Sequence, residues 1–163
     1  MLVVSDTSPI SNLAIIGRLS LLQKQFQEIW IPVAVESELS RLPNQKALAD
    51  VEQGLRDGWI KHRAVSAKAI VHILQSSLGP GEAETIALAL ELPADLVLLD
   101  ERNGRAAAVC AGLRVTGVLG VLLRAKTQGD VPMLKPELDA LKSSARFFIA
   151  SKLEQEVLQS AGE

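Results

Sequence analysis

The sequence predicts a single α/β domain, a three-layer arrangement with a central, mostly parallel sheet and helices on both faces. Short uninterrupted apolar runs such as Val3-Val4 and Leu96–Leu99 are typical of strands buried on both faces. Segments with helical spacing stand between these runs, which indicates βα units around a parallel sheet. The length of 163 residues fits one domain, and no Gly/Ser-rich or Pro-rich linker divides the chain.

The expected elements follow one another in this alternating order. Strands are expected over residues 1–5, 29–31, 59–65, 96–99 and 114–115. Helices are expected over residues 9–16, 19–26, 32–42, 46–57, 67–74, 82–92, 103–111 and 117–126, with one more from residue 151.

Local signals justify several of these boundaries. Ser8 before Pro9 predicts an N-cap followed by the first helical residue, and Gly17 predicts the end of that helix. Pro32 opens the third helix, and Pro93 closes the helix that starts at Glu82. Ser151-Lys152-Leu153-Glu154 fits a capping box at the start of the last helix.

Composition excludes several classes of protein. Apolar residues make up 48% of the chain and charged residues 22%, which excludes disordered and fibrous classes. One cysteine and two histidines are too few for a zinc site of the Cys/His kind. Cys110 is expected to be buried as apolar filler, and not to pair with His62 or His72 as a nucleophile.

The charge balance and the apolar runs bear on partners and location. The formal net charge of −2 does not indicate non-specific binding to nucleic acid, although a local patch or a bound cation can reverse the sign where it matters. The first residues lack a basic stretch ahead of an apolar one, and the longest uncharged run, Thr7–Gly17, is too short to span a bilayer. We therefore expect a cytoplasmic protein that does not enter a membrane.

Two aspartates occupy strand ends. Asp6 directly follows the first apolar strand, and Asp100 directly follows Leu96–Leu99. Open α/β sheets bind ligands beyond the carboxyl ends of their strands, so these positions favour a functional site. An aspartate after a strand also caps a helix or forms a turn, and that interpretation stays open for either residue taken alone.

Two glutamates lie on helical faces that are otherwise apolar. Glu38 stands beside the stripe formed by Val35 and Leu39, whereas Glu36 points elsewhere and is expected to face solvent. Glu82 heads the face that carries Ile86 and Ala89. A carboxylate on a core face is costly without a partner, although a glutamate in a first helical turn also favours the helix dipole.

These four acids can converge on one crevice. Clustered carboxylates repel one another and raise one another's pKa, which a hard divalent cation relieves. Mg²⁺ and Mn²⁺ prefer oxygen ligands, and their natural substrate in such a site is a phosphate ester. The residues therefore predict a phosphodiesterase with Asp6, Glu38, Glu82 and Asp100 as catalytic and metal-binding acids.

Four segments resemble the motifs of the PIN-domain nucleases, closest to the prokaryotic branch related to VapC toxins. Each segment carries one of the four acids, and the acids are separated by intervals of 32, 44 and 18 residues. The likeness runs in order from residue 2 to about residue 127. The four segments are Val3–Ile10, Ile31–Leu39, Leu78–Ala89 and Leu98–Arg105.

The resemblance implies a PIN-like fold and a Mg²⁺- or Mn²⁺-dependent endoribonuclease that hydrolyses RNA phosphodiester bonds. It implies that the protein is the toxin of a toxin–antitoxin pair, with a small protein antitoxin and a homodimer as partners. It implies outer-shell roles for Ser8, Asn12 and Glu101, which would orient the acids or a water; a plain N-cap role for Ser8 stays open. It makes Arg102 and Arg105 candidate RNA-binding residues, while the interpretation that they are solvated residues at a helix end stays open.

Two positions depart from the family pattern. Glu82 stands where most members carry Asp, so its longer side chain has to fold back, and Leu98 replaces a common Thr or Ser. We expect a PIN-like nuclease domain over residues 1–130 and a C-terminal helical extension over residues 131–163 that packs on the same domain.

Two other classes of function stay open. A catalytically inert PIN-like module that binds RNA or protein fits the acidic net charge and Glu82. A phosphotransfer domain also places Asp at a strand end, but the phosphatase type needs Asp-x-Asp-x-Thr where this chain has Asp6-Thr7-Ser8-Pro9-Ile10.

Overall fold

A five-stranded sheet forms the centre of the computed structural model, which describes residues 1–163. Every neighbouring pair of strands is parallel, so the predicted three-layer α/β fold is confirmed with a sheet that is entirely parallel. The order across the sheet is β3-β2-β1-β4-β5. The strands are β1 (Val3–Ser5), β2 (Ile29–Pro32), β3 (Ile60–Arg63), β4 (Leu96–Leu98) and β5 (Val115–Thr116).

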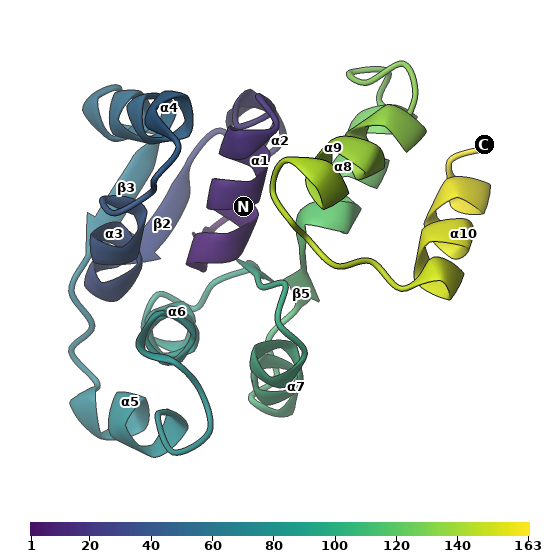
Figure 1. Cartoon of the computed structure of the whole chain (residues 1–163). Coiled ribbons are helices and arrows are strands. Elements are labelled where there is room, and N and C mark those ends of the chain that lie inside the picture. Colours follow the sequence, from purple (N-terminus) through teal and green to yellow (C-terminus); the bar gives the residue numbers. More distant parts are fainter.

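Ten helices surround the sheet (Figure 1). They are α1 (Thr7–Ile15), α2 (Ser20–Phe26), α3 (Val33–Leu39), α4 (Gln45–Arg56), α5 (Lys68–Leu74), α6 (Pro80–Glu91), α7 (Arg102–Cys110), α8 (Val118–Thr127), α9 (Lys135–Ser143) and α10 (Ser151–Ser160). None of them is both long and apolar enough to traverse a lipid bilayer.

Alternation along the strands divides the core into two halves. In β1, Val3 belongs to the larger apolar cluster, which α1, α2, α4, α8 and α9 share, whereas Val4 belongs to the cluster under α5, α6 and α7. Successive side chains of a strand point to opposite faces, so a short strand supplies both halves of the core. This explains why the predicted strands read as unbroken apolar runs.

The two central strands form the switch point of the sheet. The chain proceeds from β1 to β2 on one side and later inserts β4 on the other side of β1. Val4 pairs with Val97, and the backbone N–H of Asp6 donates to the carbonyl of Leu98 at 3.0 Å. Ligands bind outside the carboxyl ends of strands at such a point, and Asp6 and Asp100 follow these two strands.

Two predicted helix caps are wrong. Helix α1 begins at Thr7 with Asp6 in the N-cap position, so Ser8 lies inside the helix and its hydroxyl serves another partner. Helix α10 begins at Ser151 itself, with Ala150 as its N-cap residue and no side-chain cap. Ser151 and Glu154 therefore form no capping box, because Glu154 is engaged by two lysines of the preceding helix.

Residues 130–163 contain two helices that are attached in different ways. Leu134, Leu138 and Leu141 of the α9 region are fully buried in the larger core cluster. Arg18, after α1, forms a two-pronged ion pair with Glu137 at 2.6 and 3.0 Å. No residue of α10 is fully buried, so that helix depends on polar contacts and a half-buried apolar edge.

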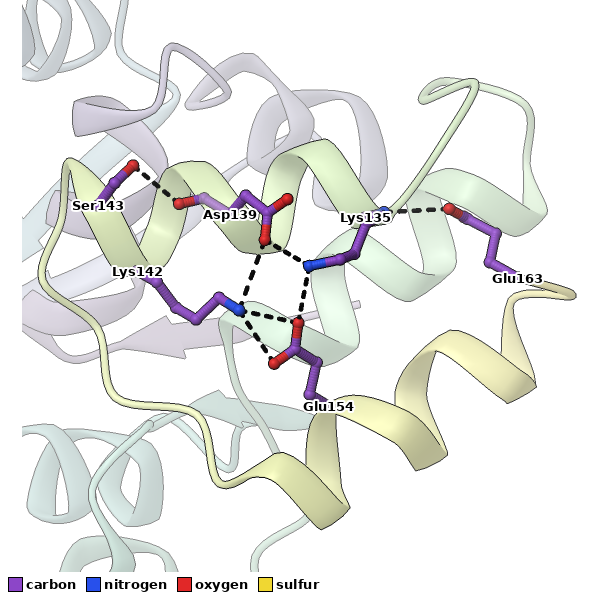
Figure 2. Close-up of polar contacts among 6 residues, drawn as sticks. All are labelled: Lys135, Asp139, Lys142, Ser143, Glu154 and Glu163. Carbon is purple, nitrogen blue, oxygen red and sulfur yellow. Dashed lines mark hydrogen bonds and ion pairs between the residues drawn. The ribbon is translucent and has the colours of Figure 1, made fainter.

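Figure 2 shows the polar contacts that hold α10 against α9. Lys142 donates to both carboxylate oxygens of Glu154 at 2.9 and 3.0 Å, and Lys135 donates to the same carboxylate at 3.2 Å. Glu163, at the other end of α10, accepts from the backbone N–H groups of Leu134 and Lys135. This clamp fixes both ends of α10 relative to the buried helix α9.

The burial of α9 predicts that it contributes to the stability of the whole domain. Leu138→Ala should lower the free energy of unfolding by about 2–5 kcal/mol, because it removes a buried side chain and leaves a cavity. Met133→Ala, an exposed apolar position of the same segment, should change it by less than about 0.5 kcal/mol. Urea unfolding checks both values, and equal effects of the two variants would contradict the packing described here.

Candidate functional site

Asp6 and Glu38 meet above the start of α6. Asp6 is 5% exposed and holds the N-cap position of α1, while Glu38 lies near the end of α3. A Cβ atom placed on Gly81 would lie 2.8 Å from Glu38 Oε1 and 3.1 Å from Asp6 Oδ1. Both carboxylates therefore border the same spot, and they reach it because position 81 has no side chain.

Thr7 orients Glu38. Its hydroxyl donates a hydrogen bond to Glu38 Oε2. Glu36, two residues earlier on α3, instead forms an ion pair with His62 Nδ1 at 2.7 Å, away from the acids. The prediction that Glu38 and not Glu36 faces the site agrees with this geometry. The role of Thr7 was missed, although Thr7 directly follows Asp6 in the first quoted motif.

Glu82 folds back over the first turn of its own helix. Its Oε1 lies 3.6 Å from a Cβ placed on Gly79, and its Oε2 lies 2.5 Å from one placed on Gly104 of α7. The back-folded path is the one expected for a side chain longer than Asp. Glu82 Oε2 is buried and has no hydrogen-bond partner. A buried carboxylate oxygen without a donor is costly, so this atom is suited to a ligand.

Asp100 is the most firmly held of the four acids. Its Oδ1 accepts from the backbone N–H of Val118 at 2.8 Å, and its Oδ2 accepts from the hydroxyl of Ser8 at 2.9 Å. Asn12 Nδ2 donates in turn to Ser8 Oγ at 2.9 Å. Ser8 and Asn12 thus form a short hydrogen-bonded chain that orients Asp100.

Arg105 and Gly117 complete the surroundings of Asp100. Arg105 Nη1 donates to the carbonyl of Leu99 at 2.8 Å; burial raises the pKa of Asp100, and the positive charge of Arg105 opposes part of that rise. A Cβ on Gly117 would lie 2.5 Å from Asp100 Oδ1. The absence of a side chain at Gly117 therefore makes room for a site carboxylate.

Burial and mutual repulsion favour the protonated forms of three acids. Burial, followed by the charges of Glu82, Glu38 and Asp100, raises the pKa of Asp6 to about 7, and the Thr7 N–H opposes part of that rise. Burial also raises the pKa of Glu82 and of Asp100. The charges of the other three acids thus all act on Asp6.

The cluster has the chemistry of a site for a hard divalent cation. All of its donors are carboxylate oxygens, it contains a buried oxygen without a partner, and it lies at the switch point of the sheet. No three acidic, histidine or cysteine side chains converge tightly enough to hold an ion as they stand.

The remaining predicted residues lie around this cluster. Glu101 is exposed at the start of α7, and its charge raises the pKa of Glu82 and of Asp100. Arg102 is exposed beside it, whereas Arg105 is half-buried and is not a solvated helix end. Cys110 is exposed, so its predicted burial is wrong: it ends α7 on the solvent side.

Sequence reasoning also missed the contribution of the C-terminal segment. Phe147 and Phe148 border a hollow that Asp100 and Arg105 line from the other side. The signal was present in Arg146-Phe147-Phe148, where a basic residue stands next to two of the few aromatic residues of the chain. A larger hollow near Met1, Glu28 and Lys61 contains none of the four acids.

Acidic side chains at the switch point of a parallel sheet place the chain among α/β proteins that bind ligands beyond the carboxyl ends of their strands. The family comparison gives the particular family: a model described as a PIN domain matches residues 2–163, and the chain belongs to the PIN-domain family. A search of curated proteins finds no match. PIN domains are generally metal-dependent nucleases, and the family match includes residues 130–163, beyond the four motifs.

The raised pKa of Asp6 predicts how the stability of the metal-free protein depends on pH. A carboxyl group ionises near pH 4 in the unfolded chain but holds its proton to about pH 7 in the fold. The folded state thus binds more protons between these values, and stability falls as the pH rises through this window. Thermal unfolding in EDTA between pH 5 and pH 8 measures this slope.

Asp6→Asn should reduce the slope and melt above the wild type at pH 8, while Glu82 and Asp100 leave a residual slope. Glu52→Gln, an exposed site on α4, should leave the profile unchanged. A wild-type midpoint that rises from pH 5 to pH 8 would contradict the electrostatic cluster.

Proposed function

We propose that this protein is a divalent-metal-dependent endoribonuclease that uses Mg²⁺ or Mn²⁺ to hydrolyse RNA phosphodiester bonds. One observation carries the proposal: four acids from four separate motifs act on one another at the switch point, where their charges help to raise the pKa of Asp6. A cluster of like charges is held together at a cost to stability, and a cation bound there offsets that cost.

Asp6, Glu38, Glu82 and Asp100 are the residues that would hold the metal. When bound, a divalent cation activates a water for attack on phosphorus and neutralises charge on the phosphate oxygens. The protein supplies orientation: Thr7 directs Glu38, and Ser8 with the Val118 N–H directs Asp100. Arg105 lies beside Asp100, where its charge would attract a phosphate group.

Further partners follow from the same proposal. Single-stranded or structured RNA is the substrate, a small protein antitoxin holds the enzyme inactive, and two copies associate as a homodimer in the cytoplasm. Glu101 would orient a water at the outer side of Glu82. The four acids and the PIN-domain match support the nuclease role; the toxin role rests on the resemblance to VapC-related proteins alone.

A second candidate function is a catalytically inert PIN-like module that binds RNA or protein. It is favoured by the observation that no three acids converge tightly enough to hold an ion as they stand. The two candidates differ in one property, because only the nuclease requires a functional metal site.

Metal binding should raise the melting temperature of the wild type. A cation that binds only the folded state at about 100 times its Kd stabilises it by about 2.7 kcal/mol. Glu38→Gln removes one proposed ligand and should melt at or above the wild type in EDTA, yet gain far less from a few millimolar MnCl₂. Glu36→Gln, the matched change two residues away, should keep the full gain. Differential scanning fluorimetry measures the three proteins, each in EDTA and in MnCl₂.

Two results would refute the metal site. One is a wild type whose melting temperature does not rise in Mn²⁺, which would favour the catalytically inert module. The other is a Glu36→Gln variant that loses the Mn²⁺ gain while Glu38→Gln keeps it, which would place the ion near His62 and away from the four acids.

Cleavage of RNA tests the nuclease proposal directly. A pool of 5′-labelled single-stranded RNAs should be cut internally by the wild type in Mn²⁺ and left intact in EDTA. Asp6→Asn, purified in parallel, should lose about 100-fold or more of the rate, because the change removes a carboxylate from the reacting centre. Glu36→Gln should retain the rate. Equal cleavage by Asp6→Asn and the wild type would identify the activity as a contaminant.

A further inference from the structure

A hollow beside Asp100 is lined by residues 100–120 and by residues 147–157 of the C-terminal segment. Its volume is about 340 Å³, within the range of small-molecule sites. Its lining includes Asp100, Arg105 and Gly117 from the surroundings of the acids, and Phe147, Phe148 and Val157 from the C-terminal segment. One of the four acids and an aromatic surface from residues 130–163 therefore line the same hollow.

Phe148 is the most exposed of the large apolar side chains. It is 86% exposed, whereas its neighbour Ile149 is 7% exposed and belongs to the main core. Phe147 packs half-buried against that core. Phe148 therefore contributes little to the core, whereas its two neighbours, Phe147 and Ile149, pack against the core and hold the segment in place.

The clamp between α9 and α10 keeps this segment in place. The backbone N–H of Phe147 donates to the carbonyl of Leu141 at 2.9 Å, which ties the segment to the end of α9. Four residues beyond Ile149, α10 carries Leu153, another lining residue, followed by Glu154, which Lys135 and Lys142 hold (Figure 2). The aromatic wall is therefore a fixed surface beside Asp100, held from both sides of Phe148.

Positive charge gathers around this wall although the whole chain is acidic. Arg105 lines the hollow, and Arg146 and Lys152 are exposed on either side of Phe147 and Phe148 in sequence. The ammonium group of Lys142 is engaged by Glu154, whereas Arg146 lines an adjoining hollow together with Phe147 and Phe148. A flat apolar face flanked by cations matches a nucleobase and its phosphates.

We propose that this hollow is a base-binding subsite for single-stranded RNA, in which a nucleobase stacks on Phe148 while Arg105 and Arg146 face the adjoining phosphates. The subsite places the stacked nucleotide next to Asp100. It rests on the proposed function for the class of substrate and adds the residues that hold that substrate. A protein segment is a weaker fit, since the wall offers one free aromatic ring between two arginines.

Binding of short RNA in EDTA tests the subsite without cleavage. The probes are fluorescent single-stranded oligoribonucleotides of eight residues, one for each base, at low salt because phosphate contacts weaken as salt rises. Phe148→Ala should weaken binding of the best probe by about fivefold or more, since one base stack contributes about 1–3 kcal/mol. Ile73→Ala, a matched exposed apolar site on α5, should leave Kd unchanged.

Two further measurements separate stacking from other causes. Phe148→Trp should bind as the wild type does, and its added indole fluorescence should be quenched by RNA. An abasic oligomer of the same length should bind the wild type and Phe148→Ala equally, because it keeps the phosphates and lacks the bases. A Phe148→Ala variant that loses affinity for both oligomers alike would overturn the assignment of a base stack.

Two other outcomes would overturn the base-binding subsite. In one, the wild type binds none of the probes. In the other, Phe148→Ala binds RNA normally but changes from dimer to monomer in sedimentation velocity, which would assign Phe148 to another interface. The proposed function fails separately, through the Mn²⁺ and cleavage experiments. RNA binding that depends on Phe148 without any Mn²⁺ stabilisation would keep the subsite and leave an inert RNA-binding module.

Discussion

The repulsion among carboxylates at the meeting of β1 and β4 is the constraint on which the rest of the site depends. Asp6 is nearly buried, and the charges of three other acids reach it, so its carboxyl group holds a proton to about pH 7. Packing elsewhere must hold these groups together against their tendency to separate. Two apolar clusters, one on each face of the sheet, provide that packing.

Three glycines, which have no side chain, are as important to the site as the acids themselves. Gly81 lets Asp6 and Glu38 approach the first turn of α6, Gly104 admits the back-folded Glu82, and Gly117 makes room for Asp100. A methyl group at any of these positions would lie 2.5–2.8 Å from a carboxylate oxygen, which is closer than van der Waals contact allows. These glycines fix how closely three helices can approach the acids.

The C-terminal residues join the domain through two different kinds of interaction. Helix α9 buries leucines in the main core, whereas α10 is held by Glu154 and Glu163 at its two ends. Charge pairs at a partly exposed surface contribute little each, so the clamp positions α10 more than it stabilises the fold. This arrangement presents Phe148 beside Asp100 and joins the segment beyond the four motifs to the candidate site.

The sequence alone predicted the five strands, nine of the ten helices and the choice of four acids, because buried parallel strands read as apolar runs and helical periodicity marks which glutamates face inward. Glu38 was separated from Glu36 in this way. No bounds were predicted for α9. Only the tertiary structure decided the contacts between distant positions: Ser8 on Asp100 instead of an N-cap, Glu154 on two lysines instead of a capping box, and Phe148 beside Asp100. Local patterns report how a segment folds on itself, whereas these partners are 12 to 92 residues apart in sequence.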